Sequence, residues 1–198
     1  MISGYGLAPW DKFFDSALSD VSKKRLVLDV GGGTPFQKEM SQFRDRFRNS
    51  HYVSLDYCAE FKPNIVGDIC QLPFADGIVD AIICKAVLEH VPEPQIAVKE
   101  MYRVLSNGGI IFVYVPFIHP YHGSKDYCDY YRYTKDGLHY LFRDFKIMDI
   151  VPVRYYFETL SSFLPRPLSS MMRPFTRLAD LVIRRKGITS GFYLLASK

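Results

Sequence analysis

The sequence lacks the usual marks of a disulfide-linked, zinc-binding or membrane-spanning protein. Its four cysteines form no C-x-x-C pair and no zinc-ligand spacing, and three of them lie in or beside apolar runs. The longest apolar run, residues 110–118, has nine residues and includes Pro116, whereas a membrane span needs roughly 20. No signal segment of charged, apolar and small residues opens the chain. We therefore expect a cytoplasmic protein with reduced thiols and no membrane span.

The sequence also has no large excess of either charge, because its net charge is +4 at pH 7. This value hides an asymmetry. Residues 154–198 hold eight Lys/Arg and two acidic residues, a net charge of +6, which leaves −2 for residues 1–153. The larger part of the chain is not basic and no RNA-module motif appears, so we expect no nucleic-acid partner.

At 198 residues and 48% hydrophobic content, the chain fits one globular domain with a sizeable core. Short apolar runs alternate with longer segments of helical character, which is typical of an α/β protein. Near-continuous apolar runs suit a parallel sheet covered on both faces, and right-handed crossovers between its strands give a doubly wound topology. The expected strands are residues 25–30, 51–55, 64–66, 78–84, 109–115, 145–153 and 191–197.

Helices are expected at residues 35–48, 93–105 and 134–142, the last with Thr134 as its N-cap. A further helical insertion is expected at residues 156–186, before the last strand. The N-terminal segment predicts an amphipathic helix that covers the core. Its apolar residues at helical spacing are Trp10, Phe13, Phe14 and Leu18.

A glycine loop, Gly31, Gly32 and Gly33, follows the first predicted strand. Without Cβ atoms the backbone can turn tightly and approach an adenosine-type cofactor, whose negative end is favoured at the following helix N-terminus. A purely structural turn between strand and helix would also explain three glycines. Asp56 favours the cofactor-binding interpretation, because it ends the second predicted strand 23 residues beyond Gly33. A carboxylate there can accept both ribose hydroxyls.

Four more motifs follow in order: G-D-I-C-Q-L-P-F at 67–74, V-D-A-I-I at 79–83, V-L-E-H-V at 87–91 and R-V-L-S-N-G-G at 103–109. With the glycine loop and Asp56, this ordered set resembles the class I S-adenosylmethionine-dependent methyltransferases over residues 26–116. The resemblance implies S-adenosylmethionine as cofactor and a Rossmann-like sheet of seven strands, mostly parallel with an antiparallel last strand. The cofactor-binding residues that it implies are Asp29, Gly31, Gly32 and Gly33 at the methionine end, Asp56 at the ribose with Tyr57 beside it, Asp68 and Ile69 at the adenine, and Lys85 near the methionine part or the acceptor.

The chain departs from this family at Pro35, where a third glycine is usual, so one backbone N–H is missing. Proline is favourable at a first helical position, so the helix is still expected. The rival from the same fold is an NAD-dependent oxidoreductase, but its G-x-G-x-x-G fingerprint requires glycine where Phe36 stands. A third alternative is a catalytically silent domain that binds S-adenosylmethionine to regulate or scaffold a partner.

Residues 116–134 follow the fifth predicted strand and would overlook the transferable methyl group; they contain two histidines, two acids and five tyrosines. For a hydroxyl acceptor we predict His119 and His122 as bases and Asp126 as their orienting partner. Backbone contacts alone could equally satisfy each histidine, and alignment of the reactants could suffice for transfer. These three side chains could instead bind a metal, but their spacing is not a recognised ligand motif, so we expect none. Glu89 and His90 are explained equally well as residues at the start of a helix.

Residues 129–138, D-Y-Y-R-Y-T-K-D-G-L, resemble a subset of bacterial methyltransferases with a D-Y-x-R-Y-T-x-x-G-L segment. Members often accompany sugar and surface-polysaccharide biosynthesis, which implies methyl transfer, by O-methylation, to a small or a lipid- or sugar-linked acceptor. Tyr130 and Tyr133 are predicted to stack on this acceptor, and Arg132 to hold its phosphate or carboxylate by a bidentate fork. A salt bridge from Arg132 to Asp126 or Asp136 is the structural alternative.

The basic tail contains an apolar helical stripe, and Arg173, Arg177 and Arg184 fall on another helix face. The stripe consists of Met171, Phe175, Leu178 and Val182. In one interpretation it packs on the sheet or forms a homodimer contact, and the arginines face water. In the other, residues 157–186 lie on an anionic membrane at its inner face, or cap a lipid-linked acceptor.

Overall fold

A computed structural model describes residues 8–183 and 187–198. Its centre is one seven-stranded sheet in the order β3-β2-β1-β4-β5-β7-β6. Strands β1 to β5 pair in parallel, whereas β7 pairs antiparallel with both β5 and β6. The predicted doubly wound sheet with an antiparallel last strand is therefore confirmed. The strands are β1 (Leu26–Val30), β2 (His51–Asp56), β3 (Ile65–Val66), β4 (Val79–Lys85), β5 (Leu105–Pro116), β6 (Lys146–Val153) and β7 (Gly191–Ser197).

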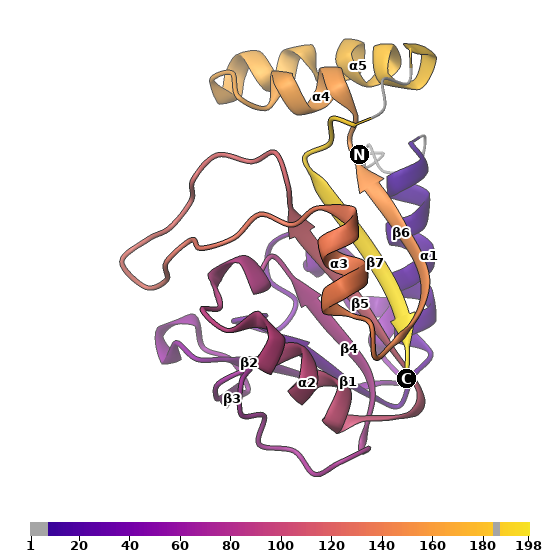
Figure 1. The fold of residues 1–198 in the computed structure, drawn as a ribbon, viewed down its shortest axis with the longest axis vertical. Helices are drawn as coiled ribbons and strands as arrows, with labels where there is room; N and C mark the ends of the chain where they lie inside the picture. Colours follow the sequence, from indigo (N-terminus) through magenta and orange to yellow (C-terminus); the bar gives the residue numbers. More distant parts are fainter. Residues whose placement is uncertain (1–7, 184–186) are drawn as a thin grey trace.

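Helices cover both faces of the sheet (Figure 1). On one face, α2 (Pro94–Val104) and α3 (Lys135–Leu141) bury Met101 and Leu138 against Leu28 and Ile82. On the other face lie α1 (Pro9–Ser22) and the 3-10 helix η1 (Lys38–Phe47). Successive residues of each central strand thus meet apolar groups on opposite sides, which explains the near-continuous apolar runs in the sequence.

The predicted N-terminal and central helices agree with the structure. In α1, Trp10, Phe14 and Leu18 are buried. At the start of α3, the Oγ1 atom of Thr134 accepts a hydrogen bond from the backbone N–H of Gly137 at 3.0 Å, as expected of an N-cap.

The helix predicted at residues 35–48 is wrong in type and in its start. Residues 38–47 form a 3-10 helix, and Pro35 lies in the turn before it rather than at the first helical position. The ring of Phe36 stacks on Tyr52 with centroids 4.0 Å apart, while Phe36 and Lys38 take φ values of +57° and +50°. Aromatic packing in the core thus replaces the first helical turn, so no helix N-terminus follows the glycine loop directly.

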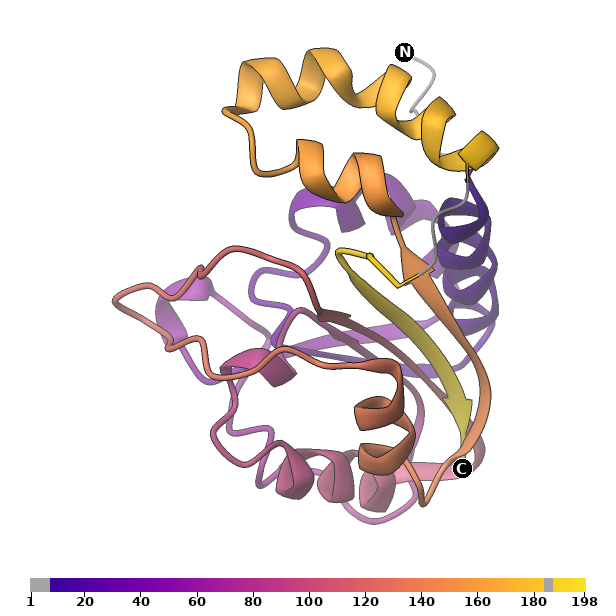
Figure 2. The same cartoon turned by 45° about the horizontal axis from the view of Figure 1, so that its top comes forward.

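Two helices, the short α4 (Tyr156–Ser161) and the longer α5 (Arg166–Ile183), lie in the insertion between β6 and β7. They lie together beyond the end of β6, on the side from which the long loop at 117–134 also leaves β5 (Figures 1 and 2). Parallel β1, β4 and β5 end at this same edge. In the part of the chain that the structure describes, every helix is too short or too polar to cross a bilayer.

Candidate functional site

A cavity of about 620 Å³ opens at the carboxyl ends of the parallel strands. This is the edge at which open α/β sheets bind their ligands, and the volume lies in the range of small-molecule sites. Its wall combines the loop after β1, the ends of β2 and β4, and the loop at 117–134. The predicted residues that line it are Asp29, Gly31, Gly32, Asp56, Tyr57, Lys85, His122 and Asp126.

The glycine loop leaves backbone exposed to this cavity because side chains do not fit there. Gly31 has a φ of +66°, and a Cβ at this position would collide with the side chain of Val87. A Cβ on Gly32 would collide with the carboxylate of Asp29. The two glycines therefore allow a ligand to approach both the main chain and Asp29.

Asp29, near the end of β1, supplies a buried carboxyl group to the cavity. The hydroxyl of Tyr52 donates a hydrogen bond to its Oδ2 atom. Burial raises the pKa of Asp29 to about 6, although this hydrogen bond and the charge of Lys85 act in the opposite direction. A ligand that brings a positive charge to Asp29 would favour its ionised form.

Lys85 ends β4 on the same wall, where its ammonium group pairs with Glu39 of η1. Burial lowers the pKa of Lys85 to about 8. The site thus offers a carboxyl group and an ammonium group side by side, which suits a ligand that carries both charges.

Asp56 ends β2, and its Oδ1 atom accepts the backbone N–H of Cys58 at 3.1 Å. Burial raises the pKa of Asp56, while hydrogen bonds from the backbones of Cys58, Gly33 and Tyr57 oppose that rise. The carboxyl group is thus held by the main chain on one side and lines the cavity on the other. Its neighbour Tyr57 is 56% exposed at the cavity rim.

Three predicted cofactor residues lie outside the lining of this cavity. Gly33 contributes through its backbone hydrogen bond to Asp56. Asp68 is exposed, and its carboxylate accepts the N–H of Cys70 at 2.8 Å. Ile69 is buried in the apolar core. The assignment of these residues to the adenine stays a prediction.

His122 lines the cavity from the loop at 117–134, whereas His119 does not line it but packs edge-on against the ring of His122 at 4.8 Å. The predicted orienting partner, Asp126, also lines the cavity, yet its neighbours are Cys58 and Glu60 rather than a histidine. His122 instead meets Asp129, through its backbone N–H at 2.9 Å and its Nδ1 atom at 3.3 Å. Asp129 is therefore a site residue that the sequence interpretation missed.

Arg132 joins this arrangement by a two-pronged ion pair with Asp129, in which Nη2 lies 2.7 Å from Oδ2. The guanidinium group holds the pKa of Asp129 well below its usual range. Arg132 also donates to the carbonyl groups of His119 and Pro120, at 3.2 and 2.9 Å. The expected salt bridge thus forms with Asp129, which lies three residues before Arg132 in the same loop, and not with Asp126 or Asp136.

The two predicted stacking tyrosines occupy different environments, and neither lines the cavity. Tyr133 is buried, and its hydroxyl donates to the carbonyl of Leu88 at 2.7 Å. Tyr130 is 50% exposed, and its backbone N–H donates to the carbonyl of Glu89 at 2.8 Å. Both residues therefore fasten the loop to the segment after β4, and their contact with an acceptor stays a prediction.

Glu89 and His90 form part of the site, although the sequence explains them equally well as helix-start residues. They lie in the 3-10 turn η3 (Leu88–His90), and His90 lines the cavity. Burial raises the pKa of Glu89 to about 8 and lowers the pKa of His90. A buried acid beside two imidazoles is a chemical feature that only the folded chain assembles.

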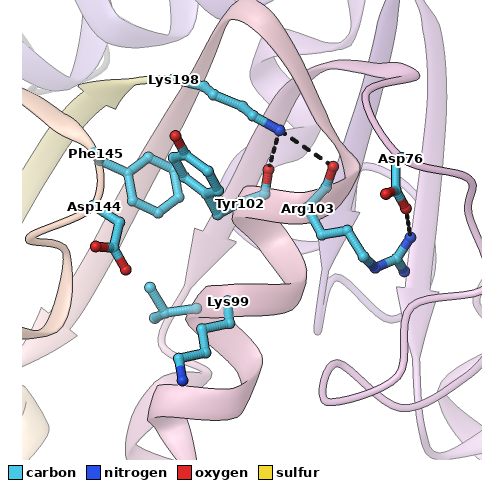
Figure 3. Close-up of a pocket in the computed structure, with 8 residues that line it drawn as sticks. Asp76, Lys99, Tyr102, Arg103, Asp144, Phe145 and Lys198 are labelled. Atoms are coloured by element: carbon cyan, nitrogen blue, oxygen red, sulfur yellow. Dashed lines mark hydrogen bonds and ion pairs between the residues drawn. The ribbon is translucent and has the colours of Figure 1, made fainter.

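A second cavity, of about 350 Å³, lies at the opposite edge of the sheet (Figure 3). Three of its charged groups have partners: Arg103 pairs with Asp76 at 2.7 Å, and Lys198 donates to the carbonyl groups of Tyr102 and Arg103 at the end of α2. A cation at a helix C-terminus is stabilising, so these contacts explain the cluster as structural.

Comparison with known families concerns the segment that forms much of the first cavity. Residues 28–113 match the family model described as "Methyltransferase domain". Residues 28–113 are therefore similar to methyltransferase domains. The matched segment runs from β1 to β5 and includes the glycine loop, Asp56, Lys85 and Glu89. This match supports the predicted methyltransferase class, and it implies S-adenosylmethionine as the cofactor.

Curated proteins similar to this chain are also named as methyltransferases. An uncharacterized methyltransferase of Mycobacterium sp. (strain KMS) is 32% identical over 138 residues, which covers 58% of this chain and 52% of that protein. A demethylmenaquinone methyltransferase of Mycolicibacterium paratuberculosis is 31% identical over 112 residues, covering 52% of this chain and 46% of that protein. This chain thus matches only about half the length of these relatives.

Among solved structures, a S-adenosylmethionine-dependent methyltransferase from Archaeoglobus fulgidus superimposes with a TM-score of 0.64 at 13% identity. The superposition covers 94% of this chain and 92% of the other. At this identity the structural similarity establishes the fold. The superimposed region extends well beyond residues 28–113 and includes the antiparallel strands.

Proposed function

We propose that this protein is an S-adenosylmethionine-dependent methyltransferase that methylates a hydroxyl group of a small or a lipid- or sugar-linked acceptor. The observation that carries the proposal is the composition of the 620 Å³ cavity. Its lining includes a glycine loop with two buried carboxyl groups and two imidazoles, those of His90 in η3 and of His122 in the loop at 117–134. Cofactor-binding and acceptor-side groups thus share one space.

The cofactor wall fits S-adenosylmethionine by shape and by charge. Gly31 and Gly32 leave room that a Cβ would fill. Asp29 and Lys85 would hold the amino and carboxylate groups of the methionine part, and Asp56 would accept the ribose hydroxyls. Asp68 and the backbone of Ile69 stay candidates for the adenine.

The acceptor wall supplies a base. When bound, the cofactor provides a methyl group on a positively charged sulfur, which is open to displacement by an oxygen. His119 or His122 would take the proton of the acceptor hydroxyl as the new C–O bond forms. Asp129 holds His122 in place through two contacts, so this histidine is the better oriented of the two.

The helices α4 and α5 support a lipid-linked acceptor, because α5 turns its apolar stripe outward. Met171, Phe175, Leu178 and Val182 are 62–75% exposed, whereas Thr176 and Asp180 are buried. The expectation that this stripe packs on the sheet is therefore wrong. The reason is that α5 packs on α4 through polar groups: Asp180 accepts the backbone N–H groups of Phe157 and Glu158 at 2.8 and 2.9 Å.

We infer peripheral contact of residues 157–186 with the inner, anionic face of a membrane. Phe163, Leu164 and Leu168 in the same insertion are exposed as well. Arg173 is exposed beside it, whereas Arg177 pairs with Asp11 and lies over the ring of Trp10. Arg184 lies outside the described residues. The similarity to a protein named demethylmenaquinone methyltransferase is consistent with this proposal.

Calorimetry tests the first step of this proposal. The purified protein is titrated with S-adenosylmethionine, with its demethylated product and with NAD in parallel. We expect one site for the first two and none for NAD. Binding of NAD alone would overturn the assignment. Cofactor binding without label transfer from S-[methyl-³H]adenosylmethionine into either lipid or aqueous extracts would favour the catalytically silent module instead.

A further inference from the structure

One buried carboxylate and two imidazoles converge at the inner wall of the cavity. The Nε2 atoms of His90 and His122 lie 3.9 and 3.7 Å from Oε1 of Glu89. All three ligand-capable atoms lie within 4.8 Å of one another. Two of the residues follow β4 and the third comes from the loop after β5, so the sheet edge brings together positions more than 30 residues apart.

The outer nitrogens of both imidazoles already have acceptors. Nδ1 of His90 lies 2.6 Å from the carbonyl oxygen of Cys128. Nδ1 of His122 lies 3.1 Å from the carbonyl oxygen of Pro120 and 3.3 Å from Asp129. Each Nδ1 must therefore carry the hydrogen, which leaves a lone pair on each Nε2 atom.

These two Nε2 atoms lie near the carboxyl group of Glu89, which accepts no hydrogen bond from another residue that the structure describes. The Glu89 side chain is 1% exposed, and within the described residues neither of its oxygens has a hydrogen-bond partner on another residue. An unpaired buried carboxylate is strongly unfavourable, and two facing lone pairs add repulsion. A cation among the three atoms would satisfy all of them at once.

We propose that Glu89, His90 and His122 bind one divalent transition-metal ion, with Zn²⁺ as the ion that fits best. Two imidazoles and one carboxylate form a ligand set that suits zinc or a similar borderline ion, whereas Mg²⁺ prefers oxygen ligands. Bonds of about 2.0–2.2 Å in a tetrahedral arrangement place ligand atoms roughly 3.5 Å apart. The observed 3.7 and 3.9 Å need only a small contraction.

The surroundings support a preformed site. The contacts of Cys128 and Asp129 with the two Nδ1 atoms are the kind of outer hydrogen bond that orients metal-binding histidines. The backbone N–H groups of Tyr130 and Tyr131 hold the carbonyl of Glu89 at 2.8 and 3.2 Å, which fixes the loop to η3. The loop that carries His122 is therefore fastened to the turn that carries Glu89 and His90, which holds the three ligands together.

The fourth position of the ion would face the cavity, because His90 and His122 line it. Three protein ligands and one open position are the pattern of catalytic rather than structural zinc. The role of the ion rests on the proposed O-methylation. An acceptor hydroxyl bound at this position would lose its proton more readily, to His119 or to solvent. Its oxygen would then form the bond to the methyl carbon while the carbon–sulfur bond breaks and its electron pair stays on sulfur.

Metal binding is measured without cofactor or acceptor. The full chain is freed of metal by a chelator, then titrated with ZnCl₂ by calorimetry and with CoCl₂ by visible absorption. We expect one equivalent of Zn²⁺ and a cobalt spectrum typical of four or five ligands. In Glu89→Gln and His122→Ala, affinity should fall by at least about a hundredfold, since each removes a ligand. His119→Ala and His139→Ala, which remove imidazoles outside the ligand set, should leave it unchanged.

Absence of saturable zinc binding by the wild type, or equal binding by Glu89→Gln, would overturn the metal site. Circular dichroism of each variant identifies any that fails to fold, and the cobalt spectrum of the wild type stands as evidence independent of every variant. The methyltransferase proposal would survive such a failure, because its own test is the titration with S-adenosylmethionine.

Discussion

Tyr52 on β2 donates its hydroxyl hydrogen to Asp29 on the neighbouring strand β1, at the inner end of the cavity. Burial raises the pKa of this carboxyl group to about 6, although the hydrogen bond from Tyr52 acts in the opposite direction. Asp29 is thereby poised to ionise when a positively charged ligand arrives. This relationship gives the site a pH dependence that can be measured.

Cofactor affinity should rise with pH between 5 and 7. The free protein holds Asp29 mostly protonated below pH 6, whereas a bound ammonium group needs the carboxylate. Affinity for S-adenosylmethionine at pH 5 should thus be about tenfold weaker than at pH 7. Lys85, with a pKa of about 8, keeps its charge throughout this window. Calorimetry at pH 5, 6 and 7 measures the trend.

The matched variant is Asp29→Asn, which keeps an acceptor for Tyr52 but cannot ionise. We expect weaker binding at pH 7 and a shallower pH profile. Burial also raises the pKa of Asp56, so a residual slope of the same sign should remain. A variant profile as steep as that of the wild type would show that Asp29 does not bind the cofactor.

Asp56→Ala should lower the affinity for S-adenosylmethionine by at least about tenfold, because a bidentate contact with the ribose is lost. Asp136→Ala removes a carboxylate from the exposed start of α3 and serves as the control for a change in net charge. Unchanged affinity in folded Asp56→Ala would remove Asp56 from the cofactor site.

His119→Ala and His122→Ala should reduce methyl transfer while cofactor affinity stays within about threefold, as expected of acceptor-side groups. A lost general base costs about a hundredfold or more in rate, and loss of His122 as the proposed metal ligand would lower the rate as well. Transfer of tritiated methyl groups into lipid extract measures it, with His139→Ala as the control. If both variants turn over normally, alignment of the reactants alone accounts for transfer.

Liposome co-sedimentation tests the outward stripe of α5. Wild-type protein should bind vesicles that contain anionic lipid, and Phe175→Ser with Val182→Ser should abolish binding, because both side chains are about three-quarters exposed. Ile96→Ser, which changes a 41% exposed apolar residue on α2, is the control. A wild type that stays in the supernatant but sediments in the ultracentrifuge as a dimer would assign the stripe to a homodimer contact.

Asp180→Ala should loosen α4 and α5 without unfolding the sheet. The buried carboxylate accepts the first backbone N–H groups of α4, and loss of such a cap costs about 1–2 kcal/mol. Hydrogen exchange should speed up at residues 157–161 while β4 and β5 stay protected. Unchanged exchange there would mean that apolar contacts, not this cap, hold the helix pair.

The sequence by itself determined the sheet, the order of its main elements and most of the cofactor wall. These follow from local rules: apolar runs of strand length, a glycine loop after a strand, and an acid at the end of the next strand. Because parallel strands end at one edge, Asp29, Asp56 and Lys85 had to come together. Six of the nine predicted cofactor residues line the cavity for this reason.

The tertiary structure alone decided what depends on contacts between distant segments. Stacking of Phe36 on Tyr52 replaced the first turn of a predicted helix. Polar packing of Asp180 beneath α4 turned an apolar stripe of α5 outward. Hydrophobic periodicity identified this stripe in the sequence, but it could not tell whether the stripe faces the core or the surface. The pairing of His122 with Asp129, and the approach of His122 to the buried Glu89, arise because a long loop folds back onto η3. No spacing in the sequence encodes such a loop-to-turn contact, since its energy comes from hydrogen bonds that only the folded chain can make.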